Sequence, residues 1–351
     1  MCFRGRSTAP TGYQSGQERS ESRAPHAGAT VSDVLTVAAA TPSLDITYVV
    51  DRLAVGAIHR PIDVVRCPGG KALNLARAAH TLDAEVRLVG LFGGGTGRWL
   101  VDELTSAGIG VRAVESGVET RTCISIADTK TGELTELYPY ADSPTAAAWS
   151  AFCDTSAALA AAPRSVPGWF AMSGGAPSGL ADDAIAAVLA AARDAGLRIA
   201  VDTHGPALAA AVAIQPDLVK INRSEAAGLL DAAEDTPLVQ LAIGVQERSG
   251  GLVVITDGAD GALGLPSPDD AGPAWQVPVP GRRGSFPVGS GDSFLGGLLA
   301  SLDRGEPLPD ALMWATACGT ANALVPGAAV FTAEAATALY AQAHAEPAAR
   351  S

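Results

Sequence analysis

A glycine-rich turn, Gly289-Ser290-Gly291, runs directly into a predicted helix that begins near Asp292. The first turn of a helix leaves backbone N–H groups unpaired and the helix dipole adds partial positive charge, so such a turn binds anions, phosphate above all. Asp292 places a carboxylate beside these donors. Donors for a phosphoryl group next to an acceptor for a hydroxyl proton are what phosphoryl transfer requires. The structural alternative is a glycine loop capped by an aspartate.

A second glycine turn enters a predicted helix much earlier in the chain. Gly69, Gly70, Lys71 and Asn74 place an ammonium group, an amide and accessible N–H groups at one helix start, which suits a polyol or a sugar phosphate. The alternative is an ordinary helix start with a solvated lysine. Arg121 offers a guanidinium group that can bind phosphate through two hydrogen bonds, although a surface arginine is the more common situation.

Two further stretches combine polar groups with glycine at the ends of predicted strands. Asn222 and Glu225 have the spacing of a helix capping box, and Glu225 is also a candidate for binding Mg²⁺ through water. Thr256, Gly258 and Gly261 follow a buried strand. They could hold nucleotide phosphates or form a simple strand-to-hairpin turn.

Two common nucleotide-binding motifs are not fulfilled. The chain has no GxxxxGK[ST] sequence, which excludes a P-loop enzyme. The run from Gly93 to Gly97 follows a strand and opens a helix, but Arg98 occupies the third glycine position of a dinucleotide fingerprint, and Glu115 is only a loose match for its acidic residue. Dinucleotide binding at this turn is therefore the weaker alternative.

The elements that carry these residues alternate between short apolar strands and helices, which predicts a mostly parallel sheet covered on both faces. In such proteins ligands bind at the carboxyl ends of the strands, where the glycine turns fall. A polar hairpin and two earlier strands predict a small separate sheet. The ranges expected for this sheet are 46–55, 62–66, 120–128 and 133–138; the strands of the main body are 34–38, 85–91, 169–172, 199–202, 218–221 and 252–255; and the last helices are 293–302, 310–323 and 333–343.

Length and charge narrow the class of protein. The chain has 351 residues and a net charge of −13, which argues against nucleic acid and anionic membrane surfaces as partners. No apolar run approaches the roughly 18 residues of a membrane span. The five cysteines are far apart, so a disulfide framework or zinc site is not expected. Residues 1–30 are polar and lack a secretory core, so we expect a disordered leader and a cytoplasmic protein.

Taken together, the motifs resemble those of the PfkB-type carbohydrate kinases of the ribokinase-like superfamily, over residues 34 to 332. They occur in the family's order: Pro42-Ser43-Leu44-Asp45, Gly69-Gly70-Lys71-Ala72-Leu73-Asn74, Gly93 to Gly97, Glu119-Thr120-Arg121, Ser173-Gly174-Gly175-Ala176-Pro177, Lys220-Ile221-Asn222-Arg223-Ser224-Glu225, Thr256-Asp257-Gly258 and Gly289-Ser290-Gly291-Asp292. Within the family, the chain is most similar to the 1-phosphofructokinase and tagatose-6-phosphate kinase branch. The narrower match rests on Tyr48-Val49-Val50-Asp51, His59-Arg60, Lys71, Thr120-Arg121 and Thr135-Glu136.

The resemblance implies a three-layer α/β/α domain over residues 31–345, with a small β-sheet lid from about 46–68 and 111–140 and a tail at 346–351. It also implies a homodimer through the lid. ATP and Mg²⁺ are the implied cosubstrate and ion, and a sugar phosphate the implied acceptor.

Residue roles follow from the resemblance position by position. Asp292 would be the base, and the N–H groups of Gly289, Ser290 and Gly291 would bind the transferring phosphoryl group. The remaining roles are substrate binding by Asp45, Gly69, Gly70, Lys71, Asn74, Arg121 and Ser173; binding of MgATP by Asn222, Glu225, Thr256, Gly258 and Gly261; and contact with adenine by Gly319 and Asn322. We expect Asp292 to stay ionised and to be a weak base, because the helix dipole favours its anion.

Three positions depart from the branch pattern, and the first two, which lie by the sugar site, leave the acceptor open. Thr41 replaces the usual asparagine before Pro42, Ala72 replaces a glycine, and Ile221 replaces the usual proline. The leading hypothesis is phosphorylation of fructose 1-phosphate to the 1,6-bisphosphate. Tagatose 6-phosphate and fructose 6-phosphate come next, followed by an unphosphorylated sugar or nucleoside, and lastly a non-catalytic regulator that binds sugar or nucleotide.

Overall fold

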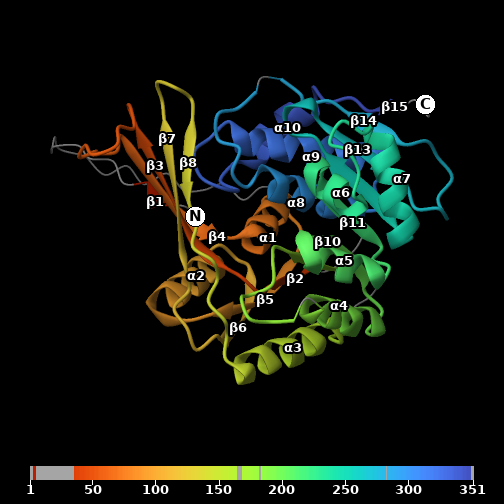
Figure 1. Cartoon of the computed structure of the whole chain (residues 1–351), viewed down its shortest axis with the longest axis horizontal. Coiled ribbons are helices and arrows are strands. Elements are labelled where there is room, and N and C mark those ends of the chain that lie inside the picture. The colour runs from red at the N-terminus through yellow and green to blue at the C-terminus, as the bar shows by residue number, and fades with distance from the viewer. Residues whose placement is uncertain (1–2, 5–34, 164–167, 182, 282, 349–351) are drawn as a thin grey trace, which may run out of the picture.

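The computed structural model describes residues 3–4, 35–163, 168–181, 183–281 and 283–348. It contains one large sheet, with helices on both faces, and one smaller sheet at its side (Figure 1). The expected α/β architecture is confirmed.

The large sheet has ten strands in the order β15-β14-β13-β12-β11-β10-β9-β2-β5-β6. The neighbours from β12 to β6 are parallel to one another, and the β13, β14 and β15 pairings are antiparallel. All five residues of β2 and all five residues of β9 are buried, because helices cover both faces of the sheet. The strands are β2 (Leu35–Ala39), β5 (Val86–Phe92), β6 (Gly110–Glu115), β9 (Trp169–Ser173), β10 (Arg198–Asp202), β11 (Leu218–Asn222), β12 (Leu252–Thr256), β13 (Ala262–Leu265), β14 (Trp275–Val277) and β15 (Glu346–Pro347).

Two groups of helices enclose this sheet. One apolar core joins the sheet to α1 (Lys71–Thr81), α2 (Gly94–Ser106), α8 (Ser290–Asp303) and α9 (Leu308–Ala323), and α10 (Ala333–Tyr340) packs on α9. The other face is covered by α3 (Ala146–Ala160), α4 (Ala184–Asp194), α5 (Gly205–Ala213), α6 (Arg223–Leu230) and α7 (Leu238–Ser249). The layers place the start of α1 and α8 over the carboxyl ends of the central strands.

The smaller sheet, here called the lid, has the order β1-β4-β3-β7-β8. Its strands are β1 (Phe3–Arg4), β3 (Ser43–Val50), β4 (Asp63–Gly69), β7 (Thr122–Asp128) and β8 (Leu134–Leu137). Two expectations are corrected. The strand expected to run to residue 55 ends at Val50, and residues 110–115 belong to the large sheet as β6, so the second part of the lid begins at Thr122.

The chain ends also differ from expectation. Phe3–Arg4 pair with β4, whereas the rest of the expected leader up to residue 30 lies outside the described residues. Glu346–Pro347 at the start of the expected tail pair with β14 as β15. Within the described ranges, every helix is too short or too polar to cross a membrane.

Candidate active site

The Gly289–Gly291 turn forms the amino end of α8. The helix begins at Ser290, near Asp292 as predicted, and Gly289 is its N-cap with a left-handed φ of 78°. A Cβ atom on Gly289 would lie 2.6 Å from the Cβ of Ala328, so glycine is required by packing as well as by conformation. The Ser290 N–H donates to Pro287 O at 3.0 Å, which leaves the N–H groups of Gly289 and Gly291 without an acceptor among the described residues.

Asp292, in the first turn of α8, is 6% exposed, and its Oδ2 accepts a hydrogen bond of 3.0 Å from Nδ2 of Asn74 on α1. Burial, and then the charge of Asp202, raise the pKa of Asp292 to about 6. The expectation that Asp292 is ionised holds at neutral pH, but the expectation of a weak base is wrong, because loss of solvent outweighs the helix dipole here. A carboxylate with this pKa is a competent base near neutral pH.

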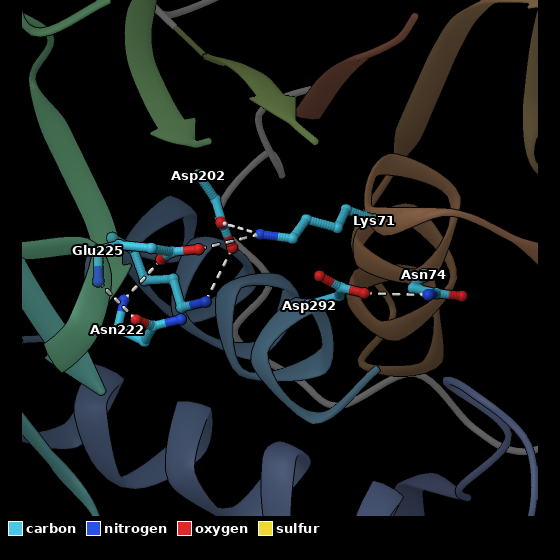
Figure 2. Close-up of polar contacts among 7 residues, drawn as sticks. Lys71, Asn74, Asp202, Asn222, Glu225 and Asp292 are labelled. Atoms are coloured by element: carbon cyan, nitrogen blue, oxygen red, sulfur yellow. Dashed lines mark hydrogen bonds and ion pairs between the residues drawn. The ribbon is translucent and has the colours of Figure 1, made fainter. Parts of the chain in front are cut away.

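The other polar atom of the Asn74 side chain, Oδ1, has no hydrogen-bond partner in the described structure. This oxygen is buried. A buried acceptor without a donor is costly, so it is usually satisfied by water or ligand. Asn74 Oδ1, on the side of the amide turned away from Asp292 (Figure 2), is thus an acceptor that the described residues leave unsatisfied.

Two lysines share one buried carboxylate beside Asp292 (Figure 2). Asp202 is fully buried at the end of β10; Lys71 Nζ lies 2.9 Å from its Oδ1 and Lys220 Nζ 2.8 Å from its Oδ2. Burial alone would raise the pKa of Asp202, but Lys220 and then Lys71 lower it below its ordinary value. Asp202 is therefore an anion that holds both ammonium groups in place.

Lys220 lies directly beneath the Gly289–Gly291 turn. A Cβ on Gly291 would come within 3.0 Å of Lys220 Nζ, and the lysine side chain is only 5% exposed. Sequence reasoning assigned Asp202 and Lys220 to buried strands without a role. The available signal was the charge itself, since an aspartate at a strand's carboxyl end and a lysine inside an apolar strand are rarely buried without a partner of opposite charge.

Lys71 lies among three carboxylates, those of Asp202, Asp292 and Glu225. In addition to Asp202, it lies 3.7 Å from Oε1 of Glu225. Burial opposes its charge, but the carboxylates of Asp202, Asp292 and Glu225 raise its pKa above the ordinary value. Lys71 therefore carries a positive charge next to Asp292.

Glu225 forms the capping box predicted from the sequence. Asn222 Oδ1 accepts from the Glu225 N–H at 2.8 Å, and Glu225 Oε2 accepts from the Asn222 N–H at 2.8 Å. Within the described residues no group of three His, Cys, Asp or Glu side chains could hold a metal by itself. The donor set fits a Mg²⁺ ion that keeps most of its waters and phosphate ligands and meets one carboxylate.

A largely apolar cavity opens beside the turn. Its lining joins the turn residues Ser290 and Gly291 to Thr256, Gly258, Gly261 and Gly319, four of the residues predicted to bind nucleotide, and includes the apolar side chains of Phe294 and Ala323. An apolar pocket next to a phosphate-binding turn suits a nucleotide base. Gly319 packs against the turn as well, since a Cβ there would lie 3.1 Å from the Ser290 carbonyl oxygen.

Asn322, which was expected near adenine, has other contacts. It is fully buried, and its Nδ2 donates to Val288 O at 2.7 Å and to Ser290 Oγ at 3.0 Å. Its position favours a role in holding the turn.

Asp45, Gly69 and Gly70 meet at the base of the lid. Asp45 Oδ1 accepts from Ser43 Oγ at 2.6 Å, and its Oδ2 accepts from the Gly70 N–H at 3.4 Å. A Cβ on Gly69 would lie 2.0 to 2.3 Å from the Asp45 carboxyl atoms, so only glycine leaves room for this side chain. Burial raises the pKa of Asp45 although Ser43 and Gly70 oppose the shift.

Arg121 and Ser173 each have a buried polar atom that makes no hydrogen bond with the described residues. Arg121 donates to Pro139 O at 2.8 Å and to Thr41 O at 3.3 Å, whereas its Nε is buried and lacks a partner in the described structure. The buried hydroxyls of Ser173 and Thr203, at the ends of β9 and β10, are also unpaired there. Thr203 was not predicted from the sequence.

The run from Gly93 to Gly97 is not available to a dinucleotide. Oε2 and Oε1 of Glu119 accept hydrogen bonds from the N–H groups of Gly95 at 3.2 Å and Thr96 at 2.8 Å. The hydrogen bond from Thr96 lowers the pKa of Glu119, which keeps it ionised. The chain therefore fills this anion position itself, which excludes the dinucleotide alternative.

Comparison with known proteins identifies the family of this chain. Residues 32–335 match the model of the pfkB family of carbohydrate kinases. Phosphofructokinase-2 from Escherichia coli in complex with fructose-6-phosphate superimposes with a TM-score of 0.77 at 25% identity, covering 89% of this chain and 99% of that chain. A possible 1-phosphofructokinase from Thermotoga maritima gives 0.78 at 21% identity, covering 90% and 99%, which shows a shared fold. With the family model spanning most of the chain, this protein belongs to the pfkB family of carbohydrate kinases and is an ATP-dependent sugar kinase.

Proposed function

We propose that this kinase transfers the γ-phosphoryl group of ATP to a hydroxyl group of a phosphorylated ketohexose, with fructose 1-phosphate as the first choice and fructose 1,6-bisphosphate as its product. The observation that carries the proposal is the buried pair of Asn74 and Asp292 at the amino end of α8, which presents the Asp292 carboxylate beside the Gly289–Gly291 turn and leaves Asn74 Oδ1 unsatisfied by the described residues.

On the acceptor side, the sugar hydroxyl donates to Asp292. Asn74 fixes the carboxylate by donating to Oδ2 and leaves its own Oδ1 for a second sugar hydroxyl. As the acceptor oxygen forms its bond to the γ-phosphorus, the bond from that phosphorus to the β,γ-bridging oxygen breaks. The hydroxyl proton passes to Asp292, and ADP leaves. Positioning supplies much of the rate in reactions of this kind.

On the phosphoryl side, three sources of positive potential converge. The N–H groups of Gly289 and Gly291 would bind the transferring group, while the Ser290 N–H donates to Pro287 O; Lys220 lies next to Gly291, and Lys71 is held by the same carboxylate as Lys220. Asp202 holds both lysines, so their charges are in place before the reaction. Preorganised donors of this kind stabilise developing charge without reorganisation.

The nucleotide would occupy the apolar cavity lined by Thr256, Gly258, Gly261 and Gly319. Mg²⁺, which would arrive on the ATP phosphates and neutralise part of their charge, would meet Glu225 through water. Asn222 orients Glu225 through the capping box.

The phosphate already on the sugar would lie near Arg121 and Ser173, which have unpaired buried polar atoms on this side. Lys71 was expected to share this task, but its ion pairs with Asp202 and Glu225 favour the transferring phosphoryl group. Thr41 and Ala72 differ from the branch pattern beside the sugar, so tagatose 6-phosphate and fructose 6-phosphate remain the alternatives.

The test is ADP release measured with MgATP and each of these three phosphosugars, together with unphosphorylated fructose, tagatose and a nucleoside. We expect the highest kcat/KM with a phosphorylated ketohexose. Asp292→Asn should lower kcat by roughly 10²–10⁴-fold, the usual contribution of a general base. Equal or better turnover of the unphosphorylated acceptors would reject the phosphosugar assignment. More than about a hundredth of the activity in Asp292→Asn would reject the role of Asp292.

A further inference from the structure

Arg77 is a charged residue of α1 to which the reaction as described assigns no task. Its guanidinium group donates to three backbone carbonyl groups. Nη1 lies 2.8 Å from Pro68 O and 3.0 Å from Ala328 O, and Nη2 lies 2.8 Å from Ala329 O. Pro68 is in lid strand β4, and the two alanines are in the segment between α9 and α10. The planar guanidinium group of Arg77 thus joins the base of the lid to a segment that is distant in the sequence.

That segment is the wall behind the Gly289–Gly291 turn. Gly289 approaches Ala328 so closely that an added Cβ would come within 2.6 Å of the Ala328 Cβ and 3.1 Å of its Cα. Ala329 has a φ of 50°, a left-handed conformation that is uncommon for alanine and persists where surrounding contacts impose it. Movement of these two alanines would displace the turn directly.

A second path connects the same segment to the turn. The Ala329 N–H donates to Asn322 Oδ1 at 2.6 Å, and Asn322 Nδ2 donates to Val288 O and Ser290 Oγ. The guanidinium of Arg77, Ala329, Asn322 and the turn therefore form one continuous hydrogen-bonded chain. Because Asn74 lies one turn earlier on the same helix, α1 also carries the residue that holds Asp292.

We propose that Arg77 is a positioning residue for phosphoryl transfer. Its guanidinium holds Ala328 and Ala329 against the Gly289–Gly291 turn and fixes the turn relative to the base of the lid. The proposal rests on the assignment of this turn as the site of the transferring phosphoryl group. Because Arg77 acts through backbone groups next to the turn, replacing it should slow the reaction step and leave the binding of adenine unchanged.

The first measurement is the steady-state kinetics of Arg77→Lys and Arg77→Ala with MgATP and the best acceptor of the wild-type protein. Lysine keeps the charge but lacks the planar fork. We expect kcat to fall about 10- to 100-fold in both, the scale of a misplaced reacting group, with KM for ATP changed less than about threefold. Millimolar guanidinium ion should restore part of kcat in Arg77→Ala only. The control is Arg112→Lys on the exposed edge strand β6, which should behave as wild type.

Amide hydrogen exchange provides a readout that needs no turnover. Both variants should exchange faster in peptides covering 284–291 and 326–331, while peptides from β9 to β12 stay as in wild type. This result would support the contact of Arg77 with the Gly289–Gly291 turn even if none of the acceptors is phosphorylated and the proposed function fails. The positioning role would be overturned by unchanged exchange in the two peptides or by a kcat within about twofold of wild type. Faster exchange across the whole sheet would also overturn it, because it would show a general loss of stability.

Discussion

At the residue scale, the site contains two buried carboxyl groups whose pKa values are shifted in opposite directions. Asp202 and Asp292 are both buried, yet the pKa of Asp202 is lowered and that of Asp292 is raised to about 6. Two lysines contact Asp202 directly, whereas Asp292 is paired with a neutral amide. The first carboxyl is thereby a fixed anion, and the second is a base that can accept a proton near neutral pH.

The raised pKa of Asp292 predicts that its charge destabilises the folded protein. Because the folded state binds this proton more tightly than the unfolded state, stability falls as pH rises from about 4 to about 6. The neutral, isosteric Asp292→Asn should relieve this cost above pH 6, by roughly 2–3 kcal/mol for a shift of about two pKa units.

Thermal unfolding of wild type and Asp292→Asn at pH 5 and pH 8 measures this effect. The variant should unfold at a higher temperature at pH 8, and the difference should shrink at pH 5. Asp269→Asn, a change at an exposed loop carboxyl, provides the control. A variant that is equally or less stable than wild type at pH 8 would show that Lys71 and Lys220 already compensate the charge of Asp292.

At the element scale, glycines determine how closely helices and strands approach the site. The sequence predicted the glycine turns at the strand ends and the α/β alternation, because both follow from local composition. It did not predict the approach distances. Gly69 leaves room for the carboxyl group of Asp45, and Gly291 lies next to the ammonium group of Lys220, each contributed by a different strand.

The elements that were not predicted from the sequence are those that depend on folding and not on local composition. The alanine-rich helices α3 and α5 lack a clear polar face, and their boundaries depend on packing in the core below the sheet. Asp202 and Lys220 were hidden within apolar strands, since only the folded sheet brings the end of β10 beside β11. Long-range pairing, unlike turn chemistry, is not encoded in neighbouring residues.

Gly69→Ala tests the close approach at the base of the lid. The added methyl group would overlap the Asp45 carboxyl, so that side chain must move away from Gly70. We expect KM for the sugar acceptor to rise at least about tenfold, equivalent to the loss of roughly one good hydrogen bond to a charged group, with little change in KM for ATP.

The matched control is Gly228→Ala on α6, where an added Cβ meets nothing within 4 Å. Both variants should be compared by steady-state kinetics with each substrate varied in turn. An unchanged KM for the acceptor in Gly69→Ala would remove Asp45 from the sugar site.

At the scale of the whole molecule, the lid stands out for its exposed apolar side chains. Val55 and Ile58 follow β3, Ile62 precedes β4, and Leu137 and Tyr140 lie at and after the end of β8; their exposed fractions range from 56% to 105%. Large apolar side chains exposed on and beside one small sheet are typical of a protein interface. We therefore propose that the lids of two copies of the chain pack together in a homodimer.

A double variant, Ile58→Asp and Tyr140→Asp, tests this interface. The two side chains are 89% and 91% exposed, so replacing them should leave the fold intact while placing charges in any apolar contact between lids. We expect light scattering to show a dimer for the wild type and a monomer for the variant, with the same unfolding temperature at low protein concentration. Ile243→Asp on α7, an exposed isoleucine away from the lid, should stay dimeric. A monomeric wild type, or a double variant that remains dimeric, would exclude the lid as the interface, and the apolar side chains would then face solvent or the sugar substrate.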